Sequence, residues 1–240
     1  MPSNRFFFEE TFHQGQIITL EGDEFHHLSH ATRKRPGESV ELINGMGMLA
    51  TGVLTEIKKN AALISIQNVL TEEKKGLRVI LIQALPRLNR LDTIIEKATE
   101  LGASSIHLFP GEHSERKDLS TSSVARLKKI AQAAIKQSGH LHIPEIIVFS
   151  TLKESLPLGG SLFFGDVDAK APLLIDALEP IKSSIGIVIG PESGLSEKEE
   201  VELKAHGAVG VKLSHAILRT DTAPIVALGL ISHILCRVQK

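Results

Sequence analysis

The chain has 240 residues, of which 42% are hydrophobic and 23% charged, and its formal net charge at pH 7 is −1. This length suits one large domain or two modest ones, and no apolar run is long enough to span a bilayer. Because the net charge is near zero, any nucleic-acid surface must be a local basic patch. A single cysteine, Cys236, excludes an internal disulfide framework and favours a reducing, cytoplasmic compartment; we expect its thiol to be buried in an apolar helix.

The first 72 residues are short apolar segments separated by turns. Strands are predicted at residues 16–20, 40–43, 52–57 and 61–69, with a short helix at 24–33. Asn44-Gly45 is a dipeptide typical of hairpins. Several short strands at close spacing predict a small β-barrel domain over residues 1–72, followed by a polar linker.

From residue 77 onward, strands and helices alternate. Strands are predicted at 77–85, 105–109, 146–149, 161–164, 185–189 and 209–213, and helices at 88–101, 120–138, 171–178, 196–206 and 222–238. Alternation of this kind predicts an α/β domain over residues 73–240, with a parallel sheet covered on both faces.

The stretch IGIVIGPESGLSEKEE, residues 185–200, is the first candidate site. An apolar strand runs into a glycine-containing loop, and Ser196 and Glu199 have the spacing of a capping box that begins a helix. Open α/β sheets bind ligands at such strand ends. The alternative is an ordinary tight turn, since the GxGxxG fingerprint and the P-loop are both absent.

A second candidate site is LSHAILRTDTAP, residues 213–224, where a strand is followed by Arg219, Thr220 and Asp221. Thr220 or Asp221 is expected to cap the next helix, and the alternative is a capped helix with a surface arginine. Histidines are scattered, with His26 and His30 on one helical face and His215 in this loop. His140 and His142 could bind a metal in principle, but they have no carboxylate or cysteine partner nearby in sequence. We interpret them, and likewise His26 and His30, as surface histidines and predict no metal site.

Basic residues form the third group of candidates. We predict RNA contacts for Arg33, Arg87, Arg90, Lys97, Arg116 and Lys136. Patches on two domains could hold one RNA backbone, whereas the alternative is solvated helix faces.

Several motifs together are specific. They are EKATELG at 96–102, SER at 114–116, IGPESGL at 189–195, LRTDTA at 218–223, the segment from His26 to Arg33, and Pro36-Gly37-Glu38. In their order and spacing, the chain resembles the RsmE family of bacterial ribosomal RNA methyltransferases, of the SPOUT class, over nearly its whole length. The chain departs from the family at Ser193, Asp221, Ser138 and His140, where the family usually has Gly, Glu, Cys and Arg.

The resemblance implies a PUA-like β-barrel followed by an α/β domain with a deep trefoil knot, in a homodimer. It also implies methylation of N3 of one uridine in 16S ribosomal RNA of the small subunit, with S-adenosylmethionine as cofactor. The cofactor residues would be Phe164, Gly165, Ile189, Gly190, Pro191, Gly194, Leu195, Leu213, Ala216, Leu218 and Thr220. Arg219 would stabilise negative charge on the uracil oxygens or position phosphate, and Asp221 or Glu192 would take the N3 proton.

Three alternatives remain open. The first is a SPOUT methyltransferase that acts on another position, such as a ribose 2′-hydroxyl in tRNA; the N-terminal barrel favours ribosomal RNA. The second is a non-catalytic rRNA-binding assembly factor, against which the Gly190 loop and the Arg219-Thr220-Asp221 cluster argue. The third is a nucleotide-dependent oxidoreductase, which only the α/β pattern supports, and a fold alone does not determine a function.

Overall fold

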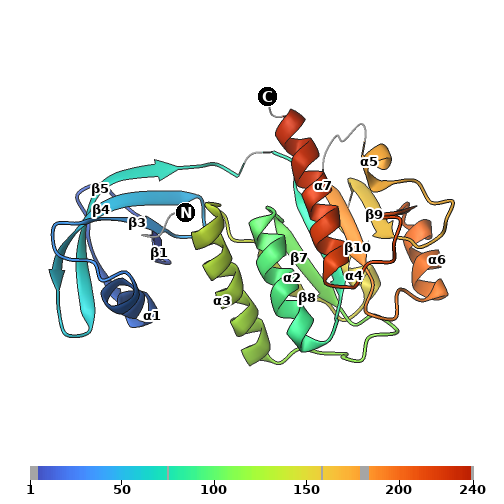
Figure 1. Cartoon of the computed structure of the whole chain (residues 1–240), viewed down its shortest axis with the longest axis horizontal. Helices are drawn as coiled ribbons and strands as arrows, with labels where there is room; N and C mark the ends of the chain where they lie inside the picture. The colour runs from blue at the N-terminus through green and yellow to red at the C-terminus, as the bar shows by residue number, and fades with distance from the viewer. Residues whose placement is uncertain (1–4, 75, 158, 179–183, 239–240) are drawn as a thin grey trace. The chain divides into compact units, whose positions relative to one another are not determined.

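The structure, a computed structural model, describes residues 5–74, 76–157, 159–178 and 184–238. The chain divides into two compact units, each with its own sheet (Figure 1). Unit 1 contains residues 1–75 and 132–143, and unit 2 contains residues 76–131 and 144–240. The sequence-based domains, 1–72 and 73–240, stay a prediction.

Unit 1 is built on a five-stranded sheet. Its strands are β1 (Arg5–Phe7), β2 (Ile17–Glu21), β3 (Ser39–Ile43), β4 (Met48–Ile57) and β5 (Ala61–Thr71), in the order β1-β3-β4-β5-β2. The pair β1–β3 is parallel and the other pairs are antiparallel. The β4–β5 register shifts at Thr51/Gly52 and again at Leu54/Glu56, and such irregularities bend and twist a strand. The described strands therefore form a curled sheet, a half-barrel, where a small barrel was expected.

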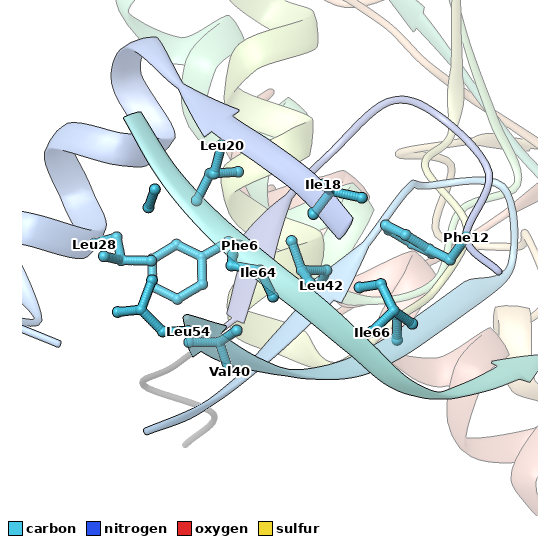
Figure 2. Packing of buried hydrophobic residues seen from close by; sticks show 12 residues of the cluster. Phe6, Phe12, Ile18, Leu20, Leu28, Val40, Leu42, Leu54, Ile64 and Ile66 are labelled. Carbon is cyan, nitrogen blue, oxygen red and sulfur yellow. The ribbon is translucent and has the colours of Figure 1, made fainter. Parts of the chain in front are cut away.

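The core of unit 1 follows from alternation along the strands. In β5, Ala62, Ile64 and Ile66 are buried while the residues between them are more exposed, so one face is apolar. Figure 2 shows side chains from several strands gathered with Leu28 of the helical segment in one cluster. The cluster contains Phe6, Phe12, Ile18, Leu20, Leu28, Val40, Leu42, Ala50, Leu54, Ala62, Ile64 and Ile66.

The helix expected at residues 24–33 is shorter and irregular. It consists of α1 (Gly22–His26) and a π-helical turn, η1 (His27–Ala31), after which Arg33 adopts a φ of 51°. His26 and His30 do share a face, as predicted, with their ring centroids 4.3 Å apart.

Residues 132–143 belong to unit 1 although they come from the second half of the chain. Ile135 and Leu141 form a small buried cluster with Ile43 of β3. Lys136 Nζ lies 2.5 Å from Glu24 Oε1. These contacts explain the assignment, which the hydrophobic pattern of a continuous helix could not reveal.

Unit 2 is built on a six-stranded parallel sheet. Its strands are β6 (Val79–Ala84), β7 (Ser105–Phe109), β8 (Glu145–Val148), β9 (Ser161–Gly165), β10 (Ile185–Ile189) and β11 (Val209–Val211), in the order β11-β9-β10-β6-β7-β8. Every residue of β6, β7 and β10 is buried, as expected for strands covered on both faces. The predicted parallel α/β architecture is confirmed.

Helices cover the two faces of this sheet. They are α2 (Leu88–Glu100), α4 (Leu152–Ser155), α5 (Leu174–Ala177), α6 (Glu197–Ala205) and α7 (Thr222–Val238), whereas α3 (Thr121–Ser138) is divided between the two units after residue 131. On one face α2 contacts α7, which packs on β10 (Figure 1). On the other face Leu152 of α4 and Leu203 of α6 cluster with Ile82 and Val188. Because strand side chains alternate, Gln83 and Ile189 face the α7 side.

Short elements differ from the sequence-based prediction. The helix expected at 171–178 contains only α5, because Pro172 disfavours a helical residue before it, and Leu173 forms a bridge with Lys212 instead. Strand β1 and helix α4, with 3 and 4 residues, were not predicted, since such short segments show almost no periodicity.

Helix α7 buries Ala227, Leu228, Ile231 and Ile234, and Cys236 lies off this apolar stripe. Its thiol is exposed, so the predicted burial is wrong for the single chain. The prediction failed because the segment is apolar on most sides, so the sequence does not show which face of the helix is buried. Among the described helices, none is both long enough and apolar enough to cross a membrane.

Candidate functional site

Three loops at the carboxyl ends of neighbouring strands in unit 2 enclose a cavity of about 430 Å³. The loops follow β9, β10 and β11, which are adjacent in the sheet. The cavity is lined by Gly165, Asp166, Val167, Ala169, Ile189, Gly190, Pro191, Glu192, Gly194, Leu195, Lys212, Leu213, Ser214, His215, Ala216, Ile217, Leu218, Thr220 and Ala223. Carboxyl ends of parallel strands are the usual ligand sites of such sheets.

The sequence-predicted cofactor residues gather at this cavity with one exception. Those that line it are Gly165, Ile189, Gly190, Pro191, Gly194, Leu195, Leu213, Ala216, Leu218 and Thr220. Phe164 lies elsewhere: its ring is fully buried in the core between the sheet and α6. Side chains alternate along β9, so Phe164 points to the face of the sheet opposite α7 and packs beneath the loop that follows β9.

The loop after β10 needs a glycine at position 190. A Cβ there would lie 2.8 Å from Leu195 N and 2.9 Å from Gly194 C, both backbone atoms that cannot yield like a flexible side chain. Gly194 has a φ of 78°, and its N–H donates to the Pro191 carbonyl at 3.0 Å. The loop is therefore a tight turn that brings backbone groups to the cavity wall.

The same loop ends in the capping box that the sequence predicts. Ser196 Oγ accepts a hydrogen bond from Glu199 N at 3.2 Å, and Glu199 Oε2 accepts from Ser196 N at 2.8 Å. The Ser196 hydroxyl also donates to Glu112 Oε2 at 2.6 Å, and this bond lowers the pKa of Glu112. The start of α6 is thus fixed to the loop after β7.

A buried amide that sequence reasoning missed joins the loops from beneath. Gln83, the polar residue near the end of β6, is fully buried. Its Nε2 lies 2.9 Å from the Ala84 carbonyl, 3.2 Å from Thr220 Oγ1 and 3.4 Å from the Gly190 carbonyl. The only available signal was a lone amide in an otherwise apolar strand, VILIQA.

The two candidate carboxylates share one arginine. Arg90 Nε lies 3.2 Å from Glu192 Oε1, and Arg90 Nη1 lies 3.3 Å from Asp221 Oδ1. Arg87 N donates to the same Glu192 oxygen at 3.2 Å. Glu192 lines the cavity, whereas Asp221 does not. Thr220 and Asp221, expected as caps of α7, direct their side chains to Gly190 and Arg90 instead.

The third candidate catalytic residue, Arg219, is exposed at the start of α7. Its side chain makes no hydrogen bond or ion pair with any residue that the structure describes. An unpaired guanidinium next to the cavity loop can bind an anion or a developing negative charge.

Most of the predicted RNA-contacting cations are paired with carboxylates. Arg87 pairs with Glu115 through two nitrogens, Lys97 with Glu96 and Glu100, Lys136 with Glu24, and Arg90 as described above. Pairing with Glu115 raises the pKa of Arg87. Arg33 and Arg116 have no carboxylate partner within the described parts of the chain. The sequence shows the positive charges but not these partners.

Histidines contribute one cavity residue, His215. His142 Nε2 lies 3.1 Å from the Glu72 carbonyl in unit 1. Across the described residues, no group of three or more His, Cys, Asp or Glu side chains could hold a metal ion.

Comparisons with known proteins give consistent results. The family model described as an RNA methyltransferase domain matches residues 72–232, and that of an RNA methyltransferase PUA domain matches residues 20–67. The chain is 27% identical to ribosomal RNA small subunit methyltransferase E of Mycobacterium bovis over 230 residues, which cover 90% of this chain and 86% of the relative. The protein of the same name from Bacillus subtilis is 28% identical over 247 residues, 95% of this chain and 96% of the relative.

A solved structure is similar over the same extent. The crystal structure of a ribosomal RNA small subunit methyltransferase E from Neisseria gonorrhoeae, bound to S-adenosyl methionine, has a TM-score of 0.84 and 29% identity. The similarity covers 96% of this chain and 97% of that one. Both sheets of the present chain therefore have counterparts in a protein that binds this cofactor.

Proposed function

Because the chain belongs to the RNA methyltransferase domain family, we propose that it transfers a methyl group from S-adenosylmethionine to N3 of one uridine in the 16S ribosomal RNA of the small subunit. The RsmE resemblance found in the sequence is confirmed by the relatives above. The observation that carries the proposal is the cavity at the ends of β9, β10 and β11, where ten of the eleven predicted cofactor residues meet.

The residues that line the cavity suit the cofactor. Ile189, Leu195, Leu213 and Leu218 provide apolar walls of the kind that an adenine ring needs, and the tight turn at Gly190 supplies backbone groups for its polar edge. The volume of about 430 Å³ lies in the range of small-molecule sites. S-adenosylmethionine, when bound, supplies an electrophilic methyl group.

Uridine N3 carries a proton at neutral pH, so the chain must accept this proton or stabilise the anion that remains. Glu192 is the carboxylate at the cavity wall. Its Oε1 accepts a hydrogen bond from Arg87 N and forms an ion pair with Arg90 Nε, whereas Oε2 has no partner in the described structure. We assign Glu192 Oε2 as the group that accepts the N3 proton, and Arg219 as the cation that stabilises charge on the uracil oxygens.

The RNA would be held by cations that no carboxylate neutralises. Arg33 of unit 1 and Arg116 of unit 2 meet this condition among the predicted contacts. Phosphate contacts of this type give affinity and register but no sequence readout.

From the resemblance we further propose a homodimer in the cytoplasm, and sedimentation at micromolar concentration would test the dimer.

The decisive experiment uses labelled S-adenosylmethionine, purified protein, and small ribosomal subunits from a strain that lacks the gene. Nucleoside analysis should find N3-methyluridine at one 16S position. The control is Gly190→Ala, which should transfer no label because the added Cβ displaces the cavity loop. Label in a ribose or in tRNA would instead favour the ribose methyltransferase. Cofactor binding without transfer to any RNA would favour an assembly factor.

A further inference from the structure

Arg90 is the cation that links the parts of the site. It projects from the first turn of α2, while Glu192 belongs to the loop after β10 and Asp221 stands just before α7. One guanidinium therefore ties α2 to two segments that lie 102 and 131 residues further along the chain, at Glu192 and Asp221.

The contacts use different edges of the guanidinium. Nε faces Glu192 Oε1 at 3.2 Å, and Nη1 faces Asp221 Oδ1 at 3.3 Å. A planar group with several fixed donors can hold two carboxylates at set positions, which a lysine ammonium does less well. Without this cation both carboxylates would lose the positive charge that they share, and the repulsion between like charges would be uncompensated.

Burial separates this arginine from the other ion-paired arginines of unit 2, Arg87 and Arg126. The side chain of Arg90 is 23% exposed, and its partners Glu192 and Asp221 are 24% and 28% exposed. In contrast, Arg87 is 58% exposed and Arg126 is 65% exposed. Partly buried charges are screened less by salt, so the two Arg90 pairs act more strongly on geometry than surface pairs do.

We propose that Arg90 is a positioning residue of the methyl-transfer site and that it does not contact RNA phosphate. It fixes Glu192 at the cavity wall through Oε1, leaving Oε2 to face the substrate, and it holds Asp221 so that the preceding Arg219 stands at the start of α7. This inference rests on the proposed function. It also replaces the sequence-based expectation that Arg90 binds RNA.

The test compares Arg90→Met and Arg90→Lys with wild type, using methyl transfer to small subunits, calorimetric binding of S-adenosylmethionine, and RNA binding at several salt concentrations. For Arg90→Met we expect kcat to fall about 10- to 100-fold, the effect of losing one charge-assisted hydrogen bond and one ion pair at the site. KM for the subunit and the slope of RNA affinity against salt should stay unchanged, and Arg90→Lys should recover part of kcat.

The matched control is Arg126→Met, which also removes one arginine and one ion pair, with Asp92, at an exposed position of the same unit. Its kcat should equal that of wild type. A raised KM for Arg90→Met with unchanged kcat, together with a salt slope lower by about one, would overturn the proposal, because that is the signature of a phosphate contact. Wild-type kinetics for Arg90→Met would overturn it as well.

A double-mutant cycle keeps the inference testable if Arg90→Met folds poorly. Glu192→Gln keeps the shape of the side chain and removes its charge, so Arg90→Lys and Glu192→Gln should be non-additive in kcat. Additive losses would show that Arg90 does not act through Glu192. If the wild-type protein binds the cofactor but methylates no RNA, the proposed function is refuted. The same double-mutant cycle can then be measured as cofactor affinity, and non-additive changes in affinity would still show that Arg90 acts through Glu192.

Discussion

The hydroxyl of Thr220 donates a hydrogen bond to the carbonyl oxygen of Gly190 at 2.8 Å and accepts one from Gln83 Nε2 at 3.2 Å. Thr220 is 5% exposed, so water cannot easily replace these partners. The bond closes the loop after β11 onto the loop after β10. The buried Thr220 hydroxyl therefore helps to fix the shape of the cavity.

Replacing Thr220 by Val keeps the shape of the side chain and removes both bonds. The Gly190 carbonyl and the Gln83 amide then lose a buried partner, which costs about 1–3 kcal/mol. We expect the free energy of unfolding to fall by this amount and the affinity for S-adenosylmethionine to fall about tenfold, as measured by urea denaturation and calorimetry. Thr220→Ser retains the hydroxyl and should bind nearly as wild type; equal defects in both variants would contradict the role of the hydroxyl.

Gly190→Ala tests the tight turn separately from stability. The new Cβ would meet backbone atoms of Gly194 and Leu195 at 2.8–3.2 Å, so the loop must move. We expect calorimetry to detect no cofactor binding, while circular dichroism shows a folded chain. Gly229→Ala in α7 is the control, since nothing lies within 4 Å of its Cβ and alanine favours helix by about 1 kcal/mol. Normal binding by Gly190→Ala would show that the loop tolerates a side chain.

Arg219→Ala should abolish methyl transfer and leave cofactor affinity unchanged. The guanidinium is exposed, and its side chain supports no other residue among those described, so its loss should not disturb the fold. Turnover and calorimetric titration on the same preparation measure the two effects. Arg219→Lys should restore only part of the rate, because an ammonium lacks the planar fork. Unchanged turnover would remove Arg219 from the mechanism.

His107 predicts a dependence of stability on pH. Burial in β7 lowers the pKa of this imidazole below its ordinary value of 6.5, and Nδ1 donates to the Ser155 carbonyl at 2.6 Å. The unfolded chain therefore binds this proton at higher pH than the folded chain. The stabilisation is fully present above pH 6.5 and is lost as pH falls through the lowered folded pKa.

The measurement is urea denaturation of wild type and His107→Asn between pH 8 and pH 5. Titrations shared by the two proteins cancel in the difference between their free energies of unfolding. As the pH falls, the free energy of unfolding of wild type should decrease relative to that of His107→Asn. A difference that is constant across the range would show that burial does not lower the pKa of His107.

The sequence was most informative where a pattern is local. The strands at 105–109 and 185–189 were predicted with the observed bounds because each is a short apolar run between clear breaks. The capping box of Ser196 and Glu199 was found for the same reason, since its two residues lie one helical turn apart. Glycine at position 190 also marked its loop correctly.

Partners distant along the chain could not be predicted. Lys136 and Glu24 are 112 residues apart, and Arg87 and Glu115 are 28 apart. Their charges are visible in the sequence, but their neutralisation is a property of the fold. The position of Phe164 was missed for a related reason: it adjoins the cavity residue Gly165, and only the direction of the strand's side chains turns it into the core.

The amide of Gln83 links groups that lie 107 and 137 residues further along the chain, at Gly190 and Thr220. Contacts of such sequence separation carry a large loop-closure cost and form slowly. During synthesis, the Gln83 amide cannot reach Gly190 or Thr220 until residue 220 has left the ribosome. We therefore expect the cofactor cavity to be among the last parts of the protein to form, so that a nascent chain cannot bind S-adenosylmethionine before its own C-terminal helix has begun to emerge.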